Sequence, residues 1–425
     1  MRIAFTTLGC KINQFESDIL RRDFETRGNT IVPFDAEADV YIINTCSVTA
    51  KSDNQCRHAI RSAVRRGHGA QVVVTGCYAE TRPEELRQIP GVHQVYGNRD
   101  KDAIVDQIMS TQASPPDLTI HPSSHIPAKA LRSRTRGFLK IQDGCNNHCS
   151  YCIVPLARGA SRSVASHEVI REFERLVQAG CPEIVLSGIH IGTYGSDLGA
   201  DMSLTELLKL LVSARADARI RLSSIEPGEI TPDMVGLIGK GLCRHLHIPL
   251  QSGDDAILSS MKRNYTSGFY RDLLERIAKQ VPGIALGADI MVGFPGEGEK
   301  EFQNTLHLVE QSPLTHLHVF SYSPRPGTSA ADMKGQVSEV IKKERSEALR
   351  ELGRKKNLKF RQIHRGIELD VVVEDKLDAS TGLLTGLTDN YLRVHIDRAK
   401  SEHIGKKLVV KIKDVNEQIN IAEIS

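Results

Sequence analysis

The segment that decides the fold reads Gly137-Phe-Leu-Lys-Ile-Gln-Asp-Gly-Cys145-Asn-Asn-His-Cys149-Ser-Tyr-Cys152. It is a short apolar run that ends in a glycine-containing turn, and this turn carries three cysteines. Three cysteines this close together cannot all pair as disulfides, but their thiolates can bind one face of an iron–sulfur cubane, which has four irons. Three local ligands would leave one iron open, as catalytic zinc sites keep an open position. The segment therefore predicts a metal cluster with an open coordination site.

The composition of the 425-residue chain is that of an ordinary soluble protein, with 40% hydrophobic and 25% charged residues. Chains of this length usually divide into two or three domains, and a net charge of +3 permits nucleic-acid binding without requiring it. The N-terminus has no cleavable signal pattern, and no apolar stretch reaches the roughly 20 residues of a membrane span. We therefore expect a cytoplasmic protein with no membrane partner, whose nine cysteines stay reduced and serve metal binding or catalysis.

Residues 1–110 alternate strand and helix patterns, which predicts an α/β domain with an open parallel sheet and helices on both faces. Strands are expected at Ile3–Leu8, Val40–Asn44, Val72–Thr75 and Val92–Tyr96. Helices are expected at Gln14–Arg27, Asp53–Arg66, Pro83–Gln88 and Lys101–Met109.

The first three of these strands each end in a cysteine, namely Cys10, Cys46 and Cys77. Open α/β sheets bind ligands outside the carboxyl ends of their strands, so these cysteines should converge at one edge of the sheet. One such cysteine is most simply a small apolar residue, but three at equivalent positions favour a second ligand set. The other cysteines match no such pattern and are expected to be structural or inert, namely Cys56, Cys181 and Cys243.

Residues 111–136 change character and predict a linker. Prolines interrupt it among serines and other polar residues, at Pro115, Pro116, Pro122 and Pro127. Its end is a basic run that is well placed for phosphate, made of Lys129, Arg132, Arg134 and Arg136.

Residues 137–360 repeat β-α units without hairpins, which predicts a partial (β/α)6 barrel with its chemistry at the carboxyl ends of the strands. Strands are expected at Phe138–Ile141, Ile184–Leu186, Ile220–Ser223, His245–Ile248, Ala288–Met291 and Leu317–Phe320. Helices are expected at Ser166–Ala179, Ser203–Ala214, Thr231–Gly239, Asp254–Met261, Ser267–Gln280 and Glu299–Glu310. The cysteine segment follows the first of these strands, where this rule places an active site.

Polar and flexible residues follow the next strands of this region. Ser187 and Gly188 come after the second strand, Glu226 after the third and Gln251 after the fourth. Glycine lets the backbone approach a ligand closely, and Glu226 and Gln251 can hydrogen-bond a ribose or an amino acid, although each could equally be ordinary turn chemistry. Three histidines could as easily be core or edge residues and are assigned no ligand role, namely His190, His245 and His247.

A charged helix is predicted at 338–362. After it, in residues 361–425, apolar residues recur at every second position. Strands are expected at Glu368–Val373, Tyr391–His395 and Lys407–Ile412. Several short strands in so few residues predict a small all-β barrel, a class often used to bind nucleic acid. At least one edge of it is basic, with Lys406, Lys407, Lys411 and Lys413.

The motif Cys145-x-x-x-Cys149-x-x-Cys152 resembles the cluster motif of radical S-adenosylmethionine enzymes. Further stretches resemble the methylthiotransferase branch of that superfamily, namely Gln142–Pro155, Arg158–Gly159, Ser223–Pro227, His247–Gly253, Met261–Thr266 and Tyr322–Thr328. Others are similar to tRNA threonylcarbamoyladenosine methylthiotransferases, namely Thr7–Gln14, Asn44–Thr49, Gly188–Gly192 and Gly386–Val394. The resemblance covers nearly the whole chain, and it implies an N-terminal methylthiotransferase domain, a radical S-adenosylmethionine core and a C-terminal RNA-binding barrel called TRAM.

This resemblance implies two [4Fe-4S] clusters and S-adenosylmethionine as cofactors. One cluster would be held by Cys145, Cys149 and Cys152 and would cleave S-adenosylmethionine to a 5′-deoxyadenosyl radical. The other would be held by Cys10, Cys46 and Cys77 and would carry the sulfur to be donated. The expected S-adenosylmethionine contacts are Ser187, Gly188, Glu226, Gln251 and Arg263. Catalytic residues beyond the cluster ligands are not implied.

The implied reaction places a methylthio group on C2 of N6-threonylcarbamoyladenosine at position 37 of tRNA, beside the anticodon. The implied partners are the anticodon loop of tRNA and a reducing electron donor such as a flavodoxin or ferredoxin, while the sulfur donor is unknown. Two alternatives share the architecture, with isopentenyladenosine 37 of tRNA or a ribosomal protein side chain as the substrate. A more distant alternative is a zinc-dependent RNA-binding protein that uses the same cysteines and barrel.

Overall fold

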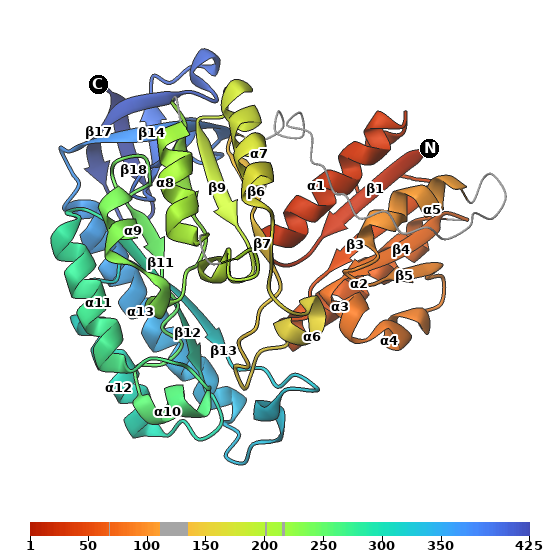
Figure 1. Cartoon of the computed structure of the whole chain (residues 1–425), viewed down its shortest axis with the longest axis horizontal. Coiled ribbons are helices and arrows are strands. Elements are labelled where there is room, and N and C mark those ends of the chain that lie inside the picture. The colour runs from red at the N-terminus through yellow and green to blue at the C-terminus, as the bar shows by residue number, and fades with distance from the viewer. Residues whose placement is uncertain (68, 111–134, 200–201, 215–216) are drawn as a thin grey trace. The chain divides into compact units, whose positions relative to one another are not determined.

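The computed structural model of the chain describes residues 1–67, 69–110, 135–199, 202–214 and 217–425 (Figure 1). The expected linker lies outside the described residues except for its last two positions, and so do its basic residues Lys129, Arg132 and Arg134. The described residues divide into two compact units. The first contains residues 1–110, 143–161 and 323–331, and the second contains 135–142, 162–322 and 332–425. Within these residues no helix is long and apolar enough to cross a membrane.

A parallel sheet of five strands in the order β2-β1-β3-β4-β5 forms the centre of the first unit (Figure 1). Its strands are β1 (Arg2–Thr7), β2 (Thr30–Val32), β3 (Val40–Thr45), β4 (Gln71–Gly76) and β5 (Gln94–Tyr96). All six positions of β3 are buried, as expected for a parallel strand covered on both faces. Sequence analysis did not predict β2, because its three residues are too few to show a periodicity.

Helices cover both faces of this sheet, because successive residues of each strand point to opposite sides. Ile3 and Phe5 of β1 pack with Phe24 on one side, and Ala4 packs with Ile60 on the other. The first face is covered by α1 (Lys11–Thr26) and by α5 (Ile104–Ser110), which follows the short turn η1 (Lys101–Ala103). The second is covered by α2 (Ala50–Arg66), α3 (Cys77–Thr81) and α4 (Pro83–Arg87). The predicted open α/β sheet is confirmed.

Two distant segments of the chain complete the first unit, the cysteine segment and residues 323–331. The Arg325 guanidinium donates to Ser47 Oγ at 2.9 Å and forms an ion pair with Asp53, and both charged side chains are almost fully buried. The Ala50 amide donates to Ser323 Oγ at 3.1 Å, and the Ala330 amide donates to the carbonyl of Ser150. The unit is therefore assembled from residues that lie far apart in the sequence.

The second unit contains the six predicted central strands. They are β6 (Gly137–Lys140), β9 (Glu183–Ser187), β10 (Arg219–Leu222), β11 (His245–His247), β12 (Ala285–Val292) and β13 (His316–Ser321). They form two parallel sheets in the orders β10-β9-β6 and β11-β12-β13. Hydrogen bonds from Cys243 N to Ile220 O at 2.8 Å and from Ile225 N to His247 O at 3.0 Å connect β10 with β11. The strands thus follow one another as in the predicted partial barrel.

One large hydrophobic core joins these strands to the helices that cover them. The helices are α7 (Ser166–Gln178), α8 (Leu204–Ala214), α9 (Pro232–Leu237), α10 (Asp255–Ser260), α11 (Ser267–Gln280), α12 (Glu299–Gln311) and α13 (Glu339–Gln362). Local signals set their starts, since Asp254 and Thr266 accept hydrogen bonds from the first amides of α10 and α11. Shorter elements are β7 (Gln142–Asp143), α6 (Val154–Arg158), β8 (Arg162–Ser163), η3 (Ile191–Thr193), η4 (Pro227–Glu229), η5 (Ser329–Asp332) and η6 (Ser401–His403).

The C-terminal residues form a closed barrel in the strand order β14-β15-β16-β18-β17. The strands are β14 (Glu368–Leu377), β15 (Leu384–Thr388), β16 (Arg393–Asp397), β17 (Lys407–Val415) and β18 (Asn420–Ile424). The predicted small all-β barrel is confirmed, but β15 and β18 were not predicted. Gly386 interrupts the alternating pattern by which β15 could have been predicted. A glycine is needed at this position because a Cβ there would lie 2.5 Å from Val371 Cγ2 of the neighbouring strand.

A buried ionic cluster fastens this barrel to the central strands. Glu183 is fully buried and accepts hydrogen bonds from Arg219 Nε at 2.7 Å and from Arg221 Nε at 2.8 Å. The same guanidiniums donate to the backbone carbonyls of Leu387 at 2.7 Å and Thr388 at 2.9 Å in β15. Each arginine therefore contacts both the central strands and the barrel.

Arg136 also belongs to this cluster. Its guanidinium lies 3.7 Å from a Glu183 carboxylate oxygen and 3.1 Å from Glu374 of β14. The sequence placed Arg136 in a basic run available to phosphate, whereas in the structure its charge is paired with these two carboxylates. Buried carboxylates need such partners, and Arg136 adds one to those that Arg219 and Arg221 supply to Glu183.

Candidate functional site

Cys10, Cys46 and Cys77 directly follow the carboxyl ends of β1, β3 and β4. Because β1 and β3 are neighbours in the order 2-1-3-4-5, Cys10 and Cys46 flank the point at which such sheets bind ligands. The thiols are close enough to interact electrostatically, Cys46 with both other cysteines and Cys77 with Cys10. No disulfide joins any of the nine cysteines, all of which lie in the described residues. The structure thus brings together the three cysteines that the sequence grouped as a second ligand set.

Glycines allow two of these strand ends to come so close. Gly9 and Gly76 have φ angles of 105° and 103°, a region that favours glycine. A Cβ on Gly9 would lie 2.8 Å from the Cβ of Cys46, and a Cβ on Gly76 would lie 2.3 Å from the Thr45 carbonyl oxygen. The pairs Gly9-Cys10 and Gly76-Cys77 therefore serve the geometry of the site.

Burial and neighbouring charges shift the pKa values of two of these thiols. Burial raises the pKa of the Cys46 thiol and of the Cys77 thiol, and the cations Arg158 and Lys101 partly offset this at Cys77. Neighbouring thiolates repel one another, which raises both pKa values further. Binding of a metal replaces these protons, since thiolates are the ligands of metal clusters. The three residues fit a cluster with cysteine ligands.

The segment from Cys145 to Cys152 belongs to the same compact unit. The Cys145 amide donates to the Gly159 carbonyl at 3.1 Å, and the Cys152 amide donates to the Cys149 carbonyl at 3.1 Å. The Asn147 amide lies 3.4 Å from Cys145 Sγ and donates to it. Hydrogen bonds to sulfur of this kind tune iron–sulfur clusters. The loop is thus folded into a tight turn around its cysteines, as a cluster-binding loop requires.

Asn98 lies between the two groups of cysteines. It follows β5, and its Nδ2 donates to the Ala157 carbonyl of α6 at 2.6 Å and lies 3.7 Å from Cys77 Sγ. One amide group therefore contacts a cysteine of one triad and the helix that follows the other. Sequence reasoning missed Asn98, although the rule that found the cysteines, a polar residue after a parallel strand, applies to it as well.

Arg158 makes a second, buried connection, with 2% of its side chain exposed. Its Nη2 donates to Asn13 Oδ1 at 2.6 Å, and Asn13 lies next to the Cys10 thiol. Its Nη1 donates to Glu16 at 2.7 Å and to Asp143 at 3.1 Å. The sequence indicated no role for Arg158 beyond its place in a family motif, because no local pattern shows which carboxylates surround it.

The expected S-adenosylmethionine contacts lie in the second unit, four of them at or after the end of a strand and Arg263 after α10. Glu226 and Arg263 form an ion pair, and the backbone N–H of Gln251 donates to the Asp289 carbonyl at 2.8 Å. Burial raises the pKa of Glu226, while the charge of Arg263 partly offsets the rise. Ser187 ends β9, and Gly188 follows it in such close contact that a Cβ there would lie 2.9 Å from Gln142 Oε1.

Three buried polar atoms near these strand ends lack hydrogen-bond partners among the residues that the structure describes. They are Ser187 Oγ, Ser223 Oγ and Gln251 Oε1. Buried polar atoms in folded proteins are almost always hydrogen-bonded. A ligand with amino, carboxylate and hydroxyl groups would supply the missing partners, so these residues fit S-adenosylmethionine.

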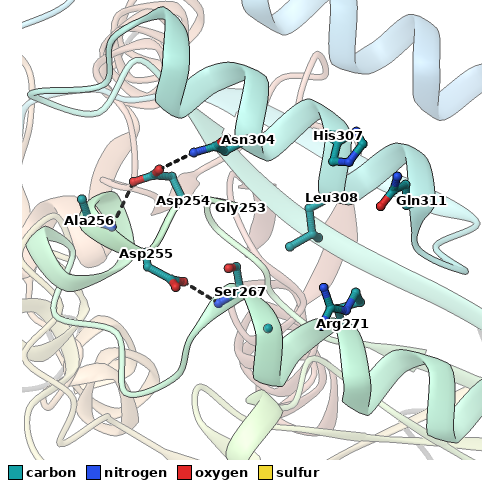
Figure 2. Close-up of a pocket in the computed structure, with 11 residues that line it drawn as sticks. Gly253, Asp254, Asp255, Ala256, Ser267, Arg271, Asn304, His307, Leu308 and Gln311 are labelled. Carbon is teal, nitrogen blue, oxygen red and sulfur yellow. Dashed lines mark hydrogen bonds between the residues drawn. The ribbon is translucent and has the colours of Figure 1, made fainter.

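The second unit also has a hollow of about 350 Å³ between α10, α11 and α12 (Figure 2). Several of its polar groups are already paired, since Asn304 donates to Asp254 at 2.8 Å and the Ser267 amide donates to Asp255 at 2.6 Å. None of the expected contact residues lines this hollow. The hollow is therefore separate from the expected site.

A larger hollow of about 590 Å³ runs between β13 and α13. Its lining includes Arg350, Arg354, Lys355 and Arg361 against two acidic residues, Glu351 and Glu417. The sequence predicted a charged helix here but not the groove, which forms only when α13 packs on β13. The surplus of positive charge suits a polyanion.

Three family models match the chain. They are Uncharacterized protein family UPF0004 at residues 2–97, the Radical SAM superfamily at 139–309 and the TRAM domain at 364–424. The solved structure of the radical S-adenosylmethionine methyltransferase TsrM from Kitasatospora setae has a TM-score of 0.58 and covers 78% of this chain and 75% of its own. At 15% identity this likeness shows the fold alone. Fold and family model together define a radical S-adenosylmethionine protein.

Curated relatives show to which family of radical S-adenosylmethionine proteins the chain belongs. Threonylcarbamoyladenosine tRNA methylthiotransferase MtaB of Bacillus subtilis (strain 168) is 39% identical over 96% of this chain and 93% of its own length. A tRNA-2-methylthio-N(6)-dimethylallyladenosine synthase of Fusobacterium nucleatum is 32% identical, with 91% of each chain covered. The chain belongs to the tRNA methylthiotransferase family of radical S-adenosylmethionine proteins. This confirms the family that the sequence motifs indicated.

Proposed function

We propose that the protein transfers a methylthio group to C2 of N6-threonylcarbamoyladenosine at position 37 of tRNA. The observation that carries this proposal is the presence of two cysteine triads in one compact unit, with Asn98 and Arg158 between them. The substrate is that in the name of the 39% identical relative. Two [4Fe-4S] clusters and S-adenosylmethionine, when bound, supply the 5′-deoxyadenosyl radical, the sulfur and the methyl group.

The cysteines have separate tasks in this proposal. Cys145, Cys149 and Cys152 hold the cluster that binds S-adenosylmethionine, and Cys10, Cys46 and Cys77 hold the cluster that carries the sulfur. Arg158 and Asn98 fix the two loops relative to each other, because both make buried contacts with residues beside the cysteines. Such positioning matters for a transfer between two sites, since small displacements of reacting groups slow reactions strongly.

The S-adenosylmethionine contacts are proposed to be Ser187, Gly188, Glu226, Gln251 and Arg263. Arg263 carries the positive charge that a carboxylate needs, and its ion pair with Glu226 holds it in place. Ser187 and Gln251 offer buried polar atoms to the ligand. These residues bind and orient the cofactor and take no part in the chemistry itself.

We further propose that the C-terminal barrel and the groove beside α13 bind the anticodon arm. The four lysines predicted to make the barrel basic, Lys406, Lys407, Lys411 and Lys413, are all exposed. A reduced flavodoxin or ferredoxin in the cytoplasm would supply electrons. The proposed domains are 1–110, a linker at 111–136, a core at 137–360 and the barrel at 361–425.

A specific observation favours a second candidate substrate, dimethylallyl (isopentenyl) adenosine 37, because a 32% identical relative carries that name. Mass spectrometry of tRNA nucleosides from cells with and without the gene distinguishes the two. Loss of the 2-methylthio derivative of threonylcarbamoyladenosine supports the proposal, and loss of the dimethylallyl derivative alone supports the second candidate. If neither derivative is lost, the result supports a ribosomal protein side chain as the substrate.

The roles of the two triads are tested with a Cys10→Ala/Cys46→Ala/Cys77→Ala variant after anaerobic reconstitution. Its iron content is expected to fall by about half, because one of two cubanes is lost. It should still cleave S-adenosylmethionine reductively, yet form no methylthiolated product. The matched control is Cys56→Ala, a buried cysteine of α2 expected to bind no iron, which should keep full iron content. A triple variant that keeps all its iron, or all its product, contradicts the proposed second cluster.

A further inference from the structure

Three adjacent strands of the second unit bring two histidines and one aspartate together. His247 lies on β11, Asp289 on β12 and His318 on β13. His247 Nε2 is 3.0 Å and His318 Nδ1 is 3.4 Å from Asp289 Oδ1. One ligand atom from each residue lies within 4.8 Å of the others. Sequence reasoning assigned His247 no ligand role, because only the strand pairing reveals its two neighbours.

The register of the strands explains this grouping. Asp289 pairs directly with His318 across β12 and β13, and His247 pairs with Gly287, two residues before Asp289. The alternating neighbours of the triad, such as Leu246 and Ile290, belong to the hydrophobic core. The triad therefore lies on the face of these strands that is turned away from that core.

The structure leaves room for the imidazole of His247 and gives the triad access to solvent. A Cβ on Gly287 would lie 2.7 Å from His247 Nδ1, so the absence of a side chain at Gly287 makes space for this ring. The exposed fractions of the side chains are 12% for His247, 26% for Asp289 and 67% for His318. One side of the triad is thus held by the sheet, and the other is open.

The chemistry of the triad is that of a metal ligand set. Two imidazoles and one carboxylate are a common ligand set for zinc and for iron(II), in sites that keep coordination positions open. We propose that His247, Asp289 and His318 bind one divalent transition-metal ion with open coordination positions.

The open coordination positions of such a metal ion could be filled by oxygen atoms of the substrate. The identity of this substrate rests on the proposed function. A threonylcarbamoyl group carries a carboxylate and a hydroxyl group, whereas a dimethylallyl group is a hydrocarbon. His318 also lines the basic groove that contains Arg350 and Arg354, where an RNA would lie. A metal ion here would bind the threonyl carboxylate and so favour a threonylcarbamoylated tRNA over an unmodified one.

Zinc binding by the full-length enzyme tests the metal site without reference to activity. The clusters are first reconstituted so that cysteines are occupied, and the protein is then incubated with zinc alone and freed of excess. We expect about one zinc ion per chain in the wild type. Asp289→Asn and His318→Ala should each weaken zinc binding by at least about tenfold, while iron per chain stays unchanged and shows that the variants fold.

The matched control is His307→Ala, which removes a histidine that lines the separate hollow of Figure 2. It should bind zinc as the wild type does. A wild type that binds no stoichiometric zinc overturns the metal site, and so do triad variants that bind zinc as tightly as the control. The triad would then be a hydrogen-bonded cluster without metal.

The carboxylate ligand is tested by tRNA binding in the presence of zinc. The wild type should bind threonylcarbamoylated tRNA more tightly than the same tRNA without this group, and His318→Ala should lose that preference. A preference that persists in His318→Ala refutes carboxylate binding by the metal. If instead no threonylcarbamoylated tRNA is methylthiolated by the wild type, the proposed function fails while the zinc measurement still decides the metal site.

Discussion

Replacing Glu183 with glutamine should strongly destabilise the protein, because this carboxylate neutralises a fully buried cluster. Its two closest partners, Arg219 and Arg221, have 8% and 2% of their side chains exposed. Burial by itself raises the pKa of Glu183, but the charges of Arg221 and Arg219 prevail and lower it from the ordinary 4.5 to about 2. Glutamine keeps the shape of the side chain and removes only its charge.

The size of the effect follows from this pKa. A fall from 4.5 to about 2 corresponds to roughly 3 kcal/mol of folding free energy, at about 1.4 kcal/mol for each tenfold change in proton affinity. This agrees with the about 3–5 kcal/mol that breaking a buried ion pair costs. Because the pKa is lowered in the folded protein, the stabilisation is present above about pH 4.5 and is lost as the pH falls toward 2. The effect of Glu183→Gln should therefore be the same at pH 6 as at about pH 8.

Urea unfolding followed by circular dichroism measures this difference in free energy. The matched control is Glu206→Gln, which removes an exposed ion pair with Lys209 and should change stability by less than about 0.5 kcal/mol. Glu183→Gln should also weaken tRNA binding, since both arginines donate to carbonyls of the C-terminal barrel. A Glu183→Gln protein within about 1 kcal/mol of the wild type would refute the reasoning about this cluster.

Two further predictions concern the site and the groove. Arg158→Met should keep both clusters, which is measured as iron per chain. It should lower the amount of methylthio product formed per S-adenosylmethionine cleaved by about ten- to a hundredfold, because the two cysteine loops lose their connection. An unchanged ratio would show that Arg158 does not position these loops. Replacing Arg350 and Arg354 by alanine should weaken tRNA binding and reduce the slope of log Kd against log salt by about 2, as expected if each contacts one phosphate. An unchanged slope would exclude the groove as the RNA surface.

The sequence predicted the six central strands and grouped both cysteine triads for physical reasons that act locally. A strand such as β3 is an uninterrupted apolar run, and the cysteines stand at fixed positions after such runs. β2 and β15 were missed, because one is very short and the other contains Gly386, whose need for close strand contact cannot be seen in the sequence.

The rest of the site depends on contacts between residues far apart in the chain. Arg158 meets Glu16 and Asn13, which are more than a hundred residues away in sequence, and no local pattern marks such a meeting. The same holds for His247 and His318, whose proximity follows from the register of strands that pair only after folding. The sequence reveals residues that recur at equivalent positions, such as the cysteines after successive strands. It does not reveal residues that only tertiary contacts bring together.

The late segment around Arg325 has a consequence for the order of events in the cell. The ribosome releases Cys10 and Cys46 long before it makes Arg325, which forms an ion pair with the buried Asp53 of α2. Domains usually fold as they emerge, N-terminal first, but this unit lacks its last segment, residues 323–331, until most of the chain has been translated. We therefore expect iron to be delivered to the finished polypeptide, after translation, and a truncated N-terminal fragment to be a poor acceptor for it.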